Sequence, residues 1–269
     1  MKKETTSERI VDNGSILDVE ALLIIAIQAA EEGCREILGV YNSGDFQAEA
    51  KGDNSPLTLA DKKAHHKIAS ILEPTGLPIL SEEGKNVPYE ERKHWNYFWM
   101  VDPLDGTKEF IKRNGEFTVN IALIHKNTPI LGVVAVPVSH EVYYGAQGHG
   151  AYLRKEGKDH KLEIRNAVDL NQEGLRVVAS RSHMNEETET FINNLNNPSL
   201  VSAGSSLKFM LLANGKADVY PRYAPTMEWD TAAAHAVVKE TGRNVIQYGT
   251  HSPLVYNKEN LLNPYFLVR

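Results

Sequence analysis

The sequence contains little cysteine and no long hydrophobic run. Cys34 is the only cysteine among 269 residues, so no disulfide can form within the chain, and a reducing compartment fits this composition. The apolar run at 21–30 is too short to span a bilayer, and the basic start at Lys2 and Lys3 is not followed by the apolar core of a signal peptide. We therefore expect a cytoplasmic protein with no transmembrane segment. Peripheral association with the inner face of the membrane stays open.

A basic excess is also missing, because 29 lysines and arginines stand against 35 aspartates and glutamates and give a net charge of −6. A nucleic-acid polymer is thus disfavoured as a partner, since its phosphate backbone requires a basic face. A small phosphorylated ligand remains compatible if bound Mg²⁺ supplies the positive charge. With 42% hydrophobic residues, the chain can form one large domain or two packed halves.

Helical periodicity begins behind a polar N-terminal segment. Residues 1–16 are polar and without a period, which predicts a flexible arm. Apolar positions from 18 to 38 follow helical spacing, with Asp18 as a plausible N-cap and Gly39 as the C-cap. Cys34 lies on this apolar stripe, so we interpret it as a core residue rather than a reactive thiol.

A second helix is predicted to run from Thr58 to about Leu72. Thr58 and Asp61 have the spacing of a capping box, in which the two side chains bind backbone N–H groups at the helix start. The apolar positions that follow, such as Ala64 and Ile68, are expected to face inward. We interpret Thr58 and Asp61 as structural residues.

The rest of the first half is predicted to be β-structure. Compact apolar stretches bounded by turn residues predict a short strand at 77–80 and a central strand at 97–101. After the central strand, tight turns separate the strands of an antiparallel meander, expected at 119–125, 130–138, 141–146 and 151–154.

Composition changes in the charged, irregular stretch that follows residue 154, and beyond it strands and helices alternate. Such alternation indicates an α/β half. We expect strands at 175–180 and 217–220 and helices at 186–195, 205–213 and 231–241. The predicted organisation is a flexible arm, an α+β subdomain and an α/β subdomain, at 1–16, 17–155 and 156–269.

Two carboxylates lie at the predicted end of the central strand. Asp102 and Asp105 are three residues apart, and they can converge on one point, where their charges would repel. A hard divalent cation such as Mg²⁺ is the usual compensation, because it takes oxygen ligands. Gly106 and Thr107 then lead into a helical turn, whose free N–H groups suit a phosphate oxygen. The alternative is an acidic surface turn, which favours the same residue types.

The longer string W-x-V-D-P-L-D-G-T-K-E-F, from Trp99 to Phe110, resembles the signature of the inositol monophosphatase-like superfamily of Mg²⁺-dependent, lithium-sensitive phosphatases. Its continuation resembles the CysQ-type branch, the 3'(2'),5'-bisphosphate nucleotidases. The segments L-S-E-E and W-D-T-A-A resemble further signatures of this family. Together these resemblances imply a shell for two or three Mg²⁺ ions formed by Glu82, Asp102, the Leu104 carbonyl, Asp105 and Asp230.

The segment D-N-S-P-x-T resembles the one whose aspartate helps to activate the attacking water, which implies that Asp53 acts with Thr107. Gly106 and Thr107 are expected to contact the phosphate. A second anion pocket is expected where Ser205 and Lys208 open a helix and Arg222 follows a strand. Taken alone, Lys208 reads as a solvent-facing lysine and His183 as a loop residue. The resemblance implies instead that the nucleotide is contacted by His183, Ser205, Lys208 and Arg222.

The implied fold is α/β (α+β), a layered αβαβα sandwich with an antiparallel N-terminal sheet and a smaller α/β C-terminal half. The implied activity is Mg²⁺-dependent hydrolysis of the 3'-phosphate of adenosine 3',5'-bisphosphate (PAP) to AMP and phosphate, linked to sulfur assimilation. An inositol monophosphatase or sugar-bisphosphate phosphatase is the alternative enzyme, and a nucleotide-binding sensor without turnover is the alternative of another class. A monomer and a homodimer both remain open, as does the preference between PAP and its sulfated relative 3'-phosphoadenylyl sulfate (PAPS).

Overall fold

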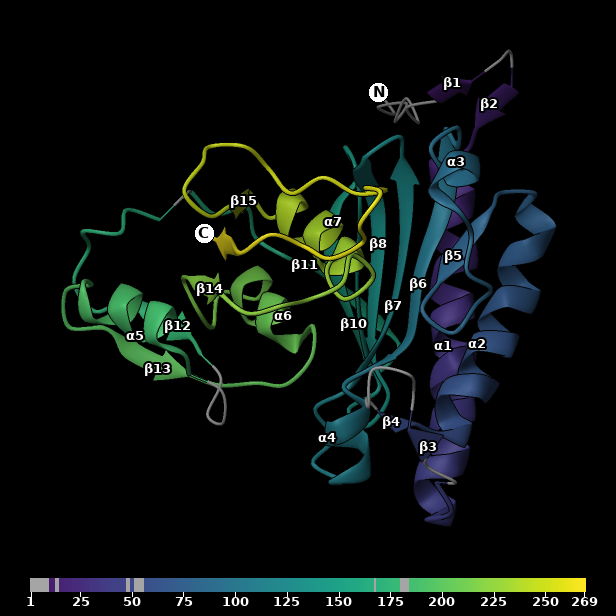
Figure 1. The fold of residues 1–269 in the computed structure, drawn as a ribbon, viewed down its shortest axis with the longest axis horizontal. Helices are drawn as coiled ribbons and strands as arrows, with labels where there is room; N and C mark the ends of the chain where they lie inside the picture. The colour runs from purple at the N-terminus through teal and green to yellow at the C-terminus, as the bar shows by residue number, and fades with distance from the viewer. Residues whose placement is uncertain (1–9, 13–14, 47–48, 51–55, 167, 180–183) are drawn as a thin grey trace.

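The computed structural model describes residues 10–12, 15–46, 49–50, 56–166, 168–179 and 184–269. The described elements form layers around a large sheet (Figure 1). The long helices α1 (Val19–Ser43) and α2 (Leu59–Leu72) cover one face, and α7 (Ala232–Glu240) packs on the other. None of the described helices is long and apolar enough to cross a bilayer.

The large sheet has seven strands in the order β11-β10-β9-β8-β7-β6-β5. The predicted meander is confirmed, since successive strands from β6 to β11 pair antiparallel, but β5 joins β6 in parallel and makes the sheet mixed. The strands are β5 (Ile79–Ser81), β6 (Tyr97–Asp105), β7 (Thr118–His125), β8 (Thr128–Val136), β9 (Glu141–Ala146), β10 (Gly150–Lys155) and β11 (Lys158–Lys161). β11 was not predicted. It continues the sheet past residue 155, and the subdomain division placed there stays a prediction.

The central strand β6 does not stop at Asp102, as the sequence suggested, but continues to Asp105. Its pairing with β7 shifts between these two residues: Asp102 opposes Asn120, and Asp105 opposes Thr118. Two residues of β6 therefore face one residue of β7, which is the arrangement of a bulge. Pro103 has no N–H for a regular ladder, and the bulge accommodates it inside the strand.

The predicted starts of both long helices are confirmed. Asp18 accepts a hydrogen bond from the Ala21 N–H at 3.0 Å, and Thr58 and Asp61 form a complete capping box. The predicted end of α1 at Gly39 is wrong, because the helix continues to Ser43 and its C-cap is Gly44, with φ of 76°. The extension buries Val40 and Tyr41, and the Tyr41 ring packs on Phe110 and Phe117, which outweighs the low helix propensity of one glycine.

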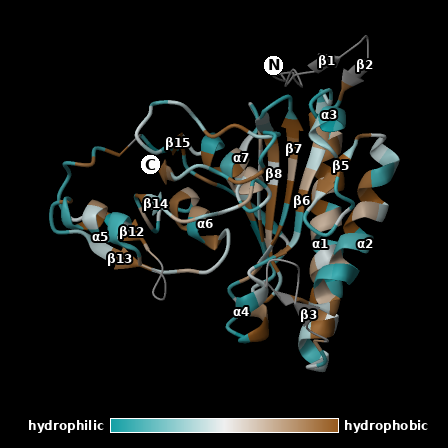
Figure 2. Cartoon of the chain, in the orientation of Figure 1, coloured by the Kyte–Doolittle hydropathy of each residue, from teal (hydrophilic) through white to brown (hydrophobic). Residues whose placement is uncertain are grey.

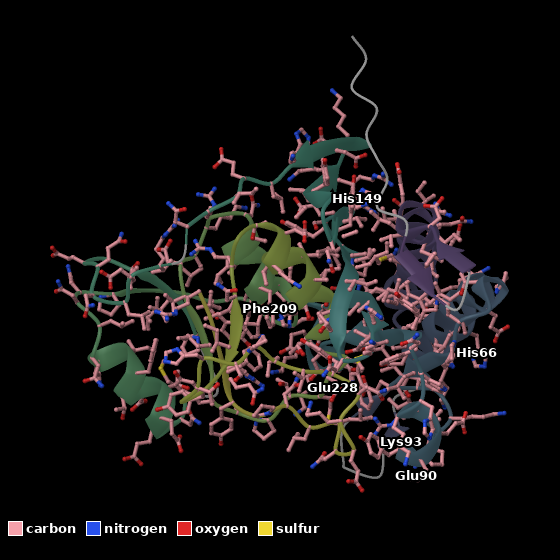
Figure 3. All side chains as sticks on the ribbon, turned by 90° about the horizontal axis from the view of Figure 1, so that it is seen from above. His66, Glu90, Lys93, His149, Phe209 and Glu228 are labelled. Atoms are coloured by element: carbon pink, nitrogen blue, oxygen red, sulfur yellow. The ribbon has the colours of Figure 1, made fainter. Side chains whose placement is uncertain are left out.

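The strands β6 to β9 are buried on both faces of the sheet, so the protein has two cores on opposite sides of it (Figure 2). Alternation along β6 sends Trp99 and Val101 toward α1 and α2, and Phe98 and Met100 toward the C-terminal half. In Figure 3, Phe209 of the second core lies in the interior, whereas His66 lies on the outer side of α2. A sheet covered on both faces explains why its strands are continuous apolar runs.

The C-terminal half contains two small sheets, β12-β13, which is parallel, and β14-β16-β15. The predicted strands and helices correspond to β12 (Arg176–Val178), α5 (Glu186–Asn193), α6 (Leu207–Ala213), β14 (Tyr220–Arg222) and α7. The sequence missed β13 (Ser199–Val201), β15 (Val245–Gln247) and β16 (Phe266–Val268), which are only three residues long. Arg222 lies in β14 rather than after the strand.

Short elements complete the fold. α3 (Tyr89–Arg92) precedes β6, α4 (Thr107–Ile111) follows it, and a single 3-10 turn, η1 (Glu73–Thr75), follows α2. Two small hairpins are formed by β1 (Ile10–Asp12) with β2 (Ser15–Leu17) and by β3 (Glu49–Ala50) with β4 (Pro56–Leu57). The β1-β2 pairing lies largely inside the segment 1–16 that was expected to carry no regular structure.

Candidate active site

Three carboxylates converge beside the ends of β5 and β6. Glu82 directly follows β5, Asp102 lies in β6, and Asp230 lies just before α7. One oxygen from each lies within 4.8 Å of the others. Glu82 and Asp102 share one edge because β5 and β6 are parallel, and the Glu82 N–H donates to the Val101 carbonyl at 3.1 Å. Asp230 reaches them from the turn before α7, which packs on the face of the sheet opposite α1 and α2.

The carboxylates of this cluster disfavour one another's ionised forms. Burial, followed by the charges of Glu82, Asp105 and Asp230, raises the pKa of Asp102 well above its usual value. Burial and the charge of Asp105 raise the pKa of Asp230 in the same way. Such a group is stabilised at neutral pH by a bound cation, and a donor set made only of oxygens suits a hard divalent ion. The described residues therefore fit a metal centre.

Asp105 lies near the cluster but is bound elsewhere. Its Oδ2 atom accepts hydrogen bonds from Ser205 Oγ at 2.5 Å, the Ser206 N–H at 2.7 Å and Ser206 Oγ at 3.0 Å. It thereby joins the strand end to the start of α6. Its predicted role as a metal ligand stays a prediction, as does that of the Leu104 carbonyl, which faces the Thr107 hydroxyl at 3.4 Å.

Thr107 meets a carboxylate that the sequence assigned only to helix capping. Its Oγ1 lies 3.3 Å from Asp61 Oδ1, while Asp61 Oδ2 accepts from the Thr58 N–H at 2.8 Å and from Thr58 Oγ1 at 2.5 Å. Asp61 is only 1% exposed. Its spacing to Ala64 and Ile68 puts it on the inward face of α2, and this signal could have identified a buried carboxylate before the structure did.

Two predicted site residues, Asp53 and His183, lie outside the described residues. Gly106 is the N-cap of α4 and has φ of 94°, in the left-handed region that favours glycine. A Cβ atom there would lie 3.3 Å from the Cβ of Ser205. Gly106 thus allows the close approach of β6 to the start of α6.

A cavity of about 620 Å³ opens beside the cluster. Its wall includes the predicted substrate residues Gly106, Ser205, Lys208 and Arg222, and also the acidic residues Asp105 and Asp230. The Lys208 Nζ atom donates to the Ser205 carbonyl at 2.9 Å, and burial lowers the pKa of this lysine although the charge of Asp105 opposes the shift. Two further lysines that the sequence analysis did not single out, Lys108 and Lys112, line the α4 side.

The fold and the site together define a class: a layered α/β protein with an acidic centre able to hold metal ions, beside a cavity whose cations suit a phosphorylated ligand. The sequence profile of the inositol monophosphatase family matches residues 18–265. The 3'(2'),5'-bisphosphate nucleotidase CysQ of Escherichia coli strain K12 is 44% identical over 245 residues, which cover 90% of this chain and 96% of that protein. The chain therefore belongs to the inositol monophosphatase family, in its CysQ branch.

Solved structures agree with this assignment. The crystal structure of CysQ from Bacteroides thetaiotaomicron, described as a bacterial member of the inositol monophosphatase family, has a TM-score of 0.83 and 48% identity, and covers 93% of this chain and 97% of that one. The inositol monophosphatase TM1415 of Thermotoga maritima has a TM-score of 0.74 at 20% identity, covering 92% and 91% of the two chains, and supports the fold alone.

Proposed function

We infer that this protein is a 3'(2'),5'-bisphosphate nucleotidase that hydrolyses the 3'-phosphate of PAP to give AMP and phosphate, in support of sulfur assimilation. The observation that carries the inference is the 44% identity to CysQ nucleotidases across 90% of the chain. The acidic cluster beside a cavity lined by Lys208 and Arg222 supports it. A cytoplasmic location remains part of the proposal, as does a monomer or homodimer.

The proposed cofactor is Mg²⁺, as two or three ions. Glu82, Asp102 and Asp230 would hold it, with Asp105 and the Leu104 carbonyl as further proposed ligands. When bound, Mg²⁺ would neutralise phosphoryl charge and lower the pKa of a water molecule. These acidic residues come from separate elements, so the fold sets the geometry of the centre.

Asp61 is the proposed proton acceptor, and Thr107 is proposed to orient the attacking water. The Thr107 hydroxyl orients the attacking water, and the Asp61 carboxylate, 3.3 Å from Thr107 Oγ1, can take the proton. Thr58 holds Asp61 through both its N–H and its hydroxyl, which fixes the second carboxylate oxygen. The role proposed for Asp53 from sequence resemblance is a competing assignment that mutation can decide.

Substrate choice is proposed to depend on the second phosphate. Lys208 and Arg222 line the cavity together with Ser205, and a bisphosphate nucleotide would bring its second phosphate to them, with His183 as a further proposed contact. An inositol monophosphate has no second phosphate to bring to Lys208 and Arg222. The presence of these two cations in the wall therefore favours the nucleotide over the inositol ester.

The proposal is tested by measuring phosphate release, with Mg²⁺ present, from PAP, PAPS, inositol 1-phosphate and a sugar bisphosphate. We expect the adenine nucleotides to be preferred, lithium to inhibit, and Asp102→Asn to abolish turnover. A Lys208→Met variant should lose more activity on PAP than on inositol 1-phosphate. Preference for inositol 1-phosphate would refute the nucleotidase assignment, and binding of PAP without phosphate release would favour a nucleotide sensor.

A further inference from the structure

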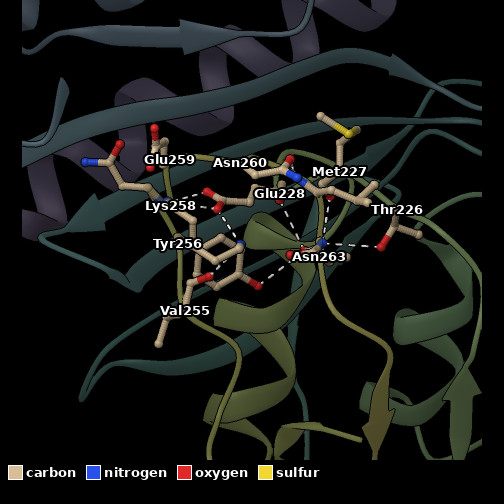
Figure 4. A network of polar contacts seen from close by, with 12 residues as sticks. Thr226, Met227, Glu228, Val255, Tyr256, Lys258, Glu259, Asn260 and Asn263 are labelled. Carbon is tan, nitrogen blue, oxygen red and sulfur yellow. Dashed lines mark hydrogen bonds and ion pairs between the residues drawn. The ribbon is translucent and has the colours of Figure 1, made fainter. Parts of the chain in front are cut away.

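Glu228 is a fully buried carboxylate that the proposed chemistry does not use. It has 0% exposure, and Figure 3 shows it in the interior. Its carboxylate accepts hydrogen bonds from the Asn257 N–H at 2.5 Å and the Lys258 N–H at 3.1 Å. Lys258 Nζ is a third donor at 2.5 Å, and Figure 4 shows this lysine beside Glu228. Burial raises the pKa of Glu228, and Lys258 opposes that shift. A buried carboxylate with this many donors is held in one position.

The backbone of Glu228 belongs to the turn that presents Asp230. The Glu228 carbonyl accepts from the Thr231 and Ala232 N–H groups at 3.1 and 3.0 Å, and Asp230 Oδ2 accepts from the Met227 N–H at 2.9 Å. The Glu228 N–H donates to the Leu261 carbonyl at 2.9 Å. Asn263 binds the same turn through Met227 and Thr231 (Figure 4). Residues 255–263 therefore brace the turn from outside the cluster.

The same segment also binds the first half of the chain. Arg92, at the end of α3, donates from Nη1 to Asn257 Oδ1 and from Nη2 to the Glu259 carbonyl, both at 2.8 Å. Asn257 Nδ2 donates in return to the Arg92 carbonyl at 2.7 Å. Arg92 is 3% exposed and lies between Glu82 and Asp102 in the sequence. Partly buried polar contacts thus link the Asp230 turn, through residues 257–259, to α3, which precedes the strand that carries Asp102.

We propose that Glu228 and Asn257 are positioning residues for the metal centre, which set where Asp230 lies relative to Glu82 and Asp102. The proposal rests on the proposed metal-dependent function. Glu228 fixes the Asp230 turn to residues 257–258, and Asn257 fixes that segment to Arg92. Contacts of this kind, one step removed from the ligands, orient metal ligands and change metal affinity when they are removed.

Two variants test the link at separate points. Glu228→Gln keeps the size of the side chain but replaces an oxygen acceptor with an amide donor that faces N–H groups and an ammonium. Asn257→Gly removes both hydrogen bonds between the Asn257 side chain and Arg92, tolerates the left-handed backbone at φ of 63° and keeps the N–H that donates to Glu228. Calorimetric titration of the metal-free full-length protein with Mg²⁺ is the main measurement, and the Mg²⁺ dependence of phosphate release is the second.

We expect the Mg²⁺ dissociation constant to rise roughly 10-fold in Glu228→Gln and by a smaller factor in Asn257→Gly. The loss of phosphate-release activity in both variants should be larger at limiting than at saturating Mg²⁺, because the substitutions weaken metal binding. Asp218→Asn is the matched control: it also replaces a carboxylate in an ion pair, that with Arg176 at 2.6 Å, and should lower thermal stability without changing Mg²⁺ affinity.

Unchanged Mg²⁺ affinity in the folded variants, together with lower thermal stability, would show a purely structural role and overturn the proposal. If Glu228→Gln does not fold, the Mg²⁺ affinity of Asn257→Gly alone tests the proposal. A wild-type protein that binds no Mg²⁺ would instead overturn the proposed metal centre itself, so the two failures are distinguishable.

Discussion

Thr107 has two candidate carboxylate partners, Asp53 from sequence resemblance and Asp61 from the geometry of the described residues. Resemblance points to Asp53, whereas the structure places Asp61 with its Oδ1 atom 3.3 Å from Thr107 Oγ1. Asp61 is also the buried capping residue of α2, so a single carboxylate holds the helix start with one oxygen and faces Thr107 with the other. Capping and a catalytic role are therefore compatible at this position.

Replacing each aspartate by asparagine separates the two assignments. We expect Asp61→Asn to lower kcat by roughly 10²- to 10⁴-fold, the usual contribution of a positioned general base, with little change in the KM for PAP. The effect of Asp53→Asn, compared with that of Asp61→Asn, decides which aspartate acts as the base. Steady-state kinetics on both variants and on Thr107→Val is the measurement, and a larger loss in Asp53→Asn would return the base role to that residue.

At the scale of elements, the placement of α7 on the sheet decides where Asp230 lies. Gly132 in β8 faces the helix directly, because a Cβ atom built there would lie 2.1 Å from the Ala233 carbonyl oxygen and 2.9 Å from the Ala236 Cβ. The first of these neighbours is helix backbone and cannot turn aside as a flexible side chain would. The absence of a side chain at Gly132 lets α7 approach the sheet closely.

Gly132→Ala should therefore be destabilising, by about 1–3 kcal/mol or more, because α7 has to move away from β8. Gly39→Ala is the matched control in the interior of α1, where no atom lies within 4 Å of the added Cβ. We expect this substitution to stabilise the protein by up to about 1 kcal/mol through helix propensity. Urea unfolding of both variants measures the difference, and equal effects would contradict close packing at Gly132.

α7 also carries a buried histidine that should make stability depend on pH. Burial, with a smaller effect of Lys239, lowers the pKa of His235 from 6.5 to about 3, and its Nδ1 lies 2.9 Å from the Tyr256 hydroxyl. Between these two values the unfolded chain binds a proton that the folded protein does not. The free energy of unfolding therefore falls as the pH drops from 6.5 toward 3, and above pH 6.5 the histidine causes no such loss.

The contribution of His235 to the slope should be about 1.4 kcal/mol per pH unit within this window. His235→Gln keeps a group that can bind the Tyr256 hydroxyl and should reduce the slope by that amount. Urea unfolding at several pH values between 4 and 7.5 is the measurement, with His160→Gln, at an exposed position of β11, as the control. An unchanged slope in His235→Gln would show that the histidine does not resist protonation.

At the scale of the whole molecule, the acidic cluster joins the two halves of the chain. Glu82 and Asp102 come from the large sheet, and Asp230 comes from the start of α7. The raised pKa values of Asp102 and Asp230 mean that keeping both ionised without a cation costs free energy. A metal ion that binds only the folded protein would remove this cost and stabilise the molecule as a unit.

We expect Mg²⁺ at 100 times its dissociation constant to stabilise the protein by about 2.7 kcal/mol, which corresponds to roughly 5–10 °C in Tm. Asp102→Asn should abolish this increment and leave the metal-free protein at least as stable, since one repelling carboxylate is gone. Thermal unfolding in Mg²⁺ and in a chelator measures both effects. A Tm that does not respond to Mg²⁺ in the wild type would argue against the metal centre.

Local features were predicted well from the sequence because they depend on nearby residues. The caps at Asp18 and Thr58, the meander after the central strand, and the helix that begins after Asp230 follow from side-chain types within a few positions. The errors occur where distant packing overrides local preference. α1 continues through Gly39 because Val40 and Tyr41 are buried in the core, where Tyr41 packs on Phe110 and Phe117, and the short strands β15 and β16 exist because they pair with each other.

The sequence by itself determined the family, the layered fold and the acidic residues of the centre, since each depends on contiguous motifs around Glu82, Asp102 and Asp230. The tertiary structure alone decided which groups meet: Asp61 with Thr107, Asp105 with the start of α6, and Glu228 with Lys258. These pairs lie 46, 101 and 30 positions apart in the chain. Local propensity carries no information about such distances, and only the packing of helices on both faces of the sheet brings the partners together.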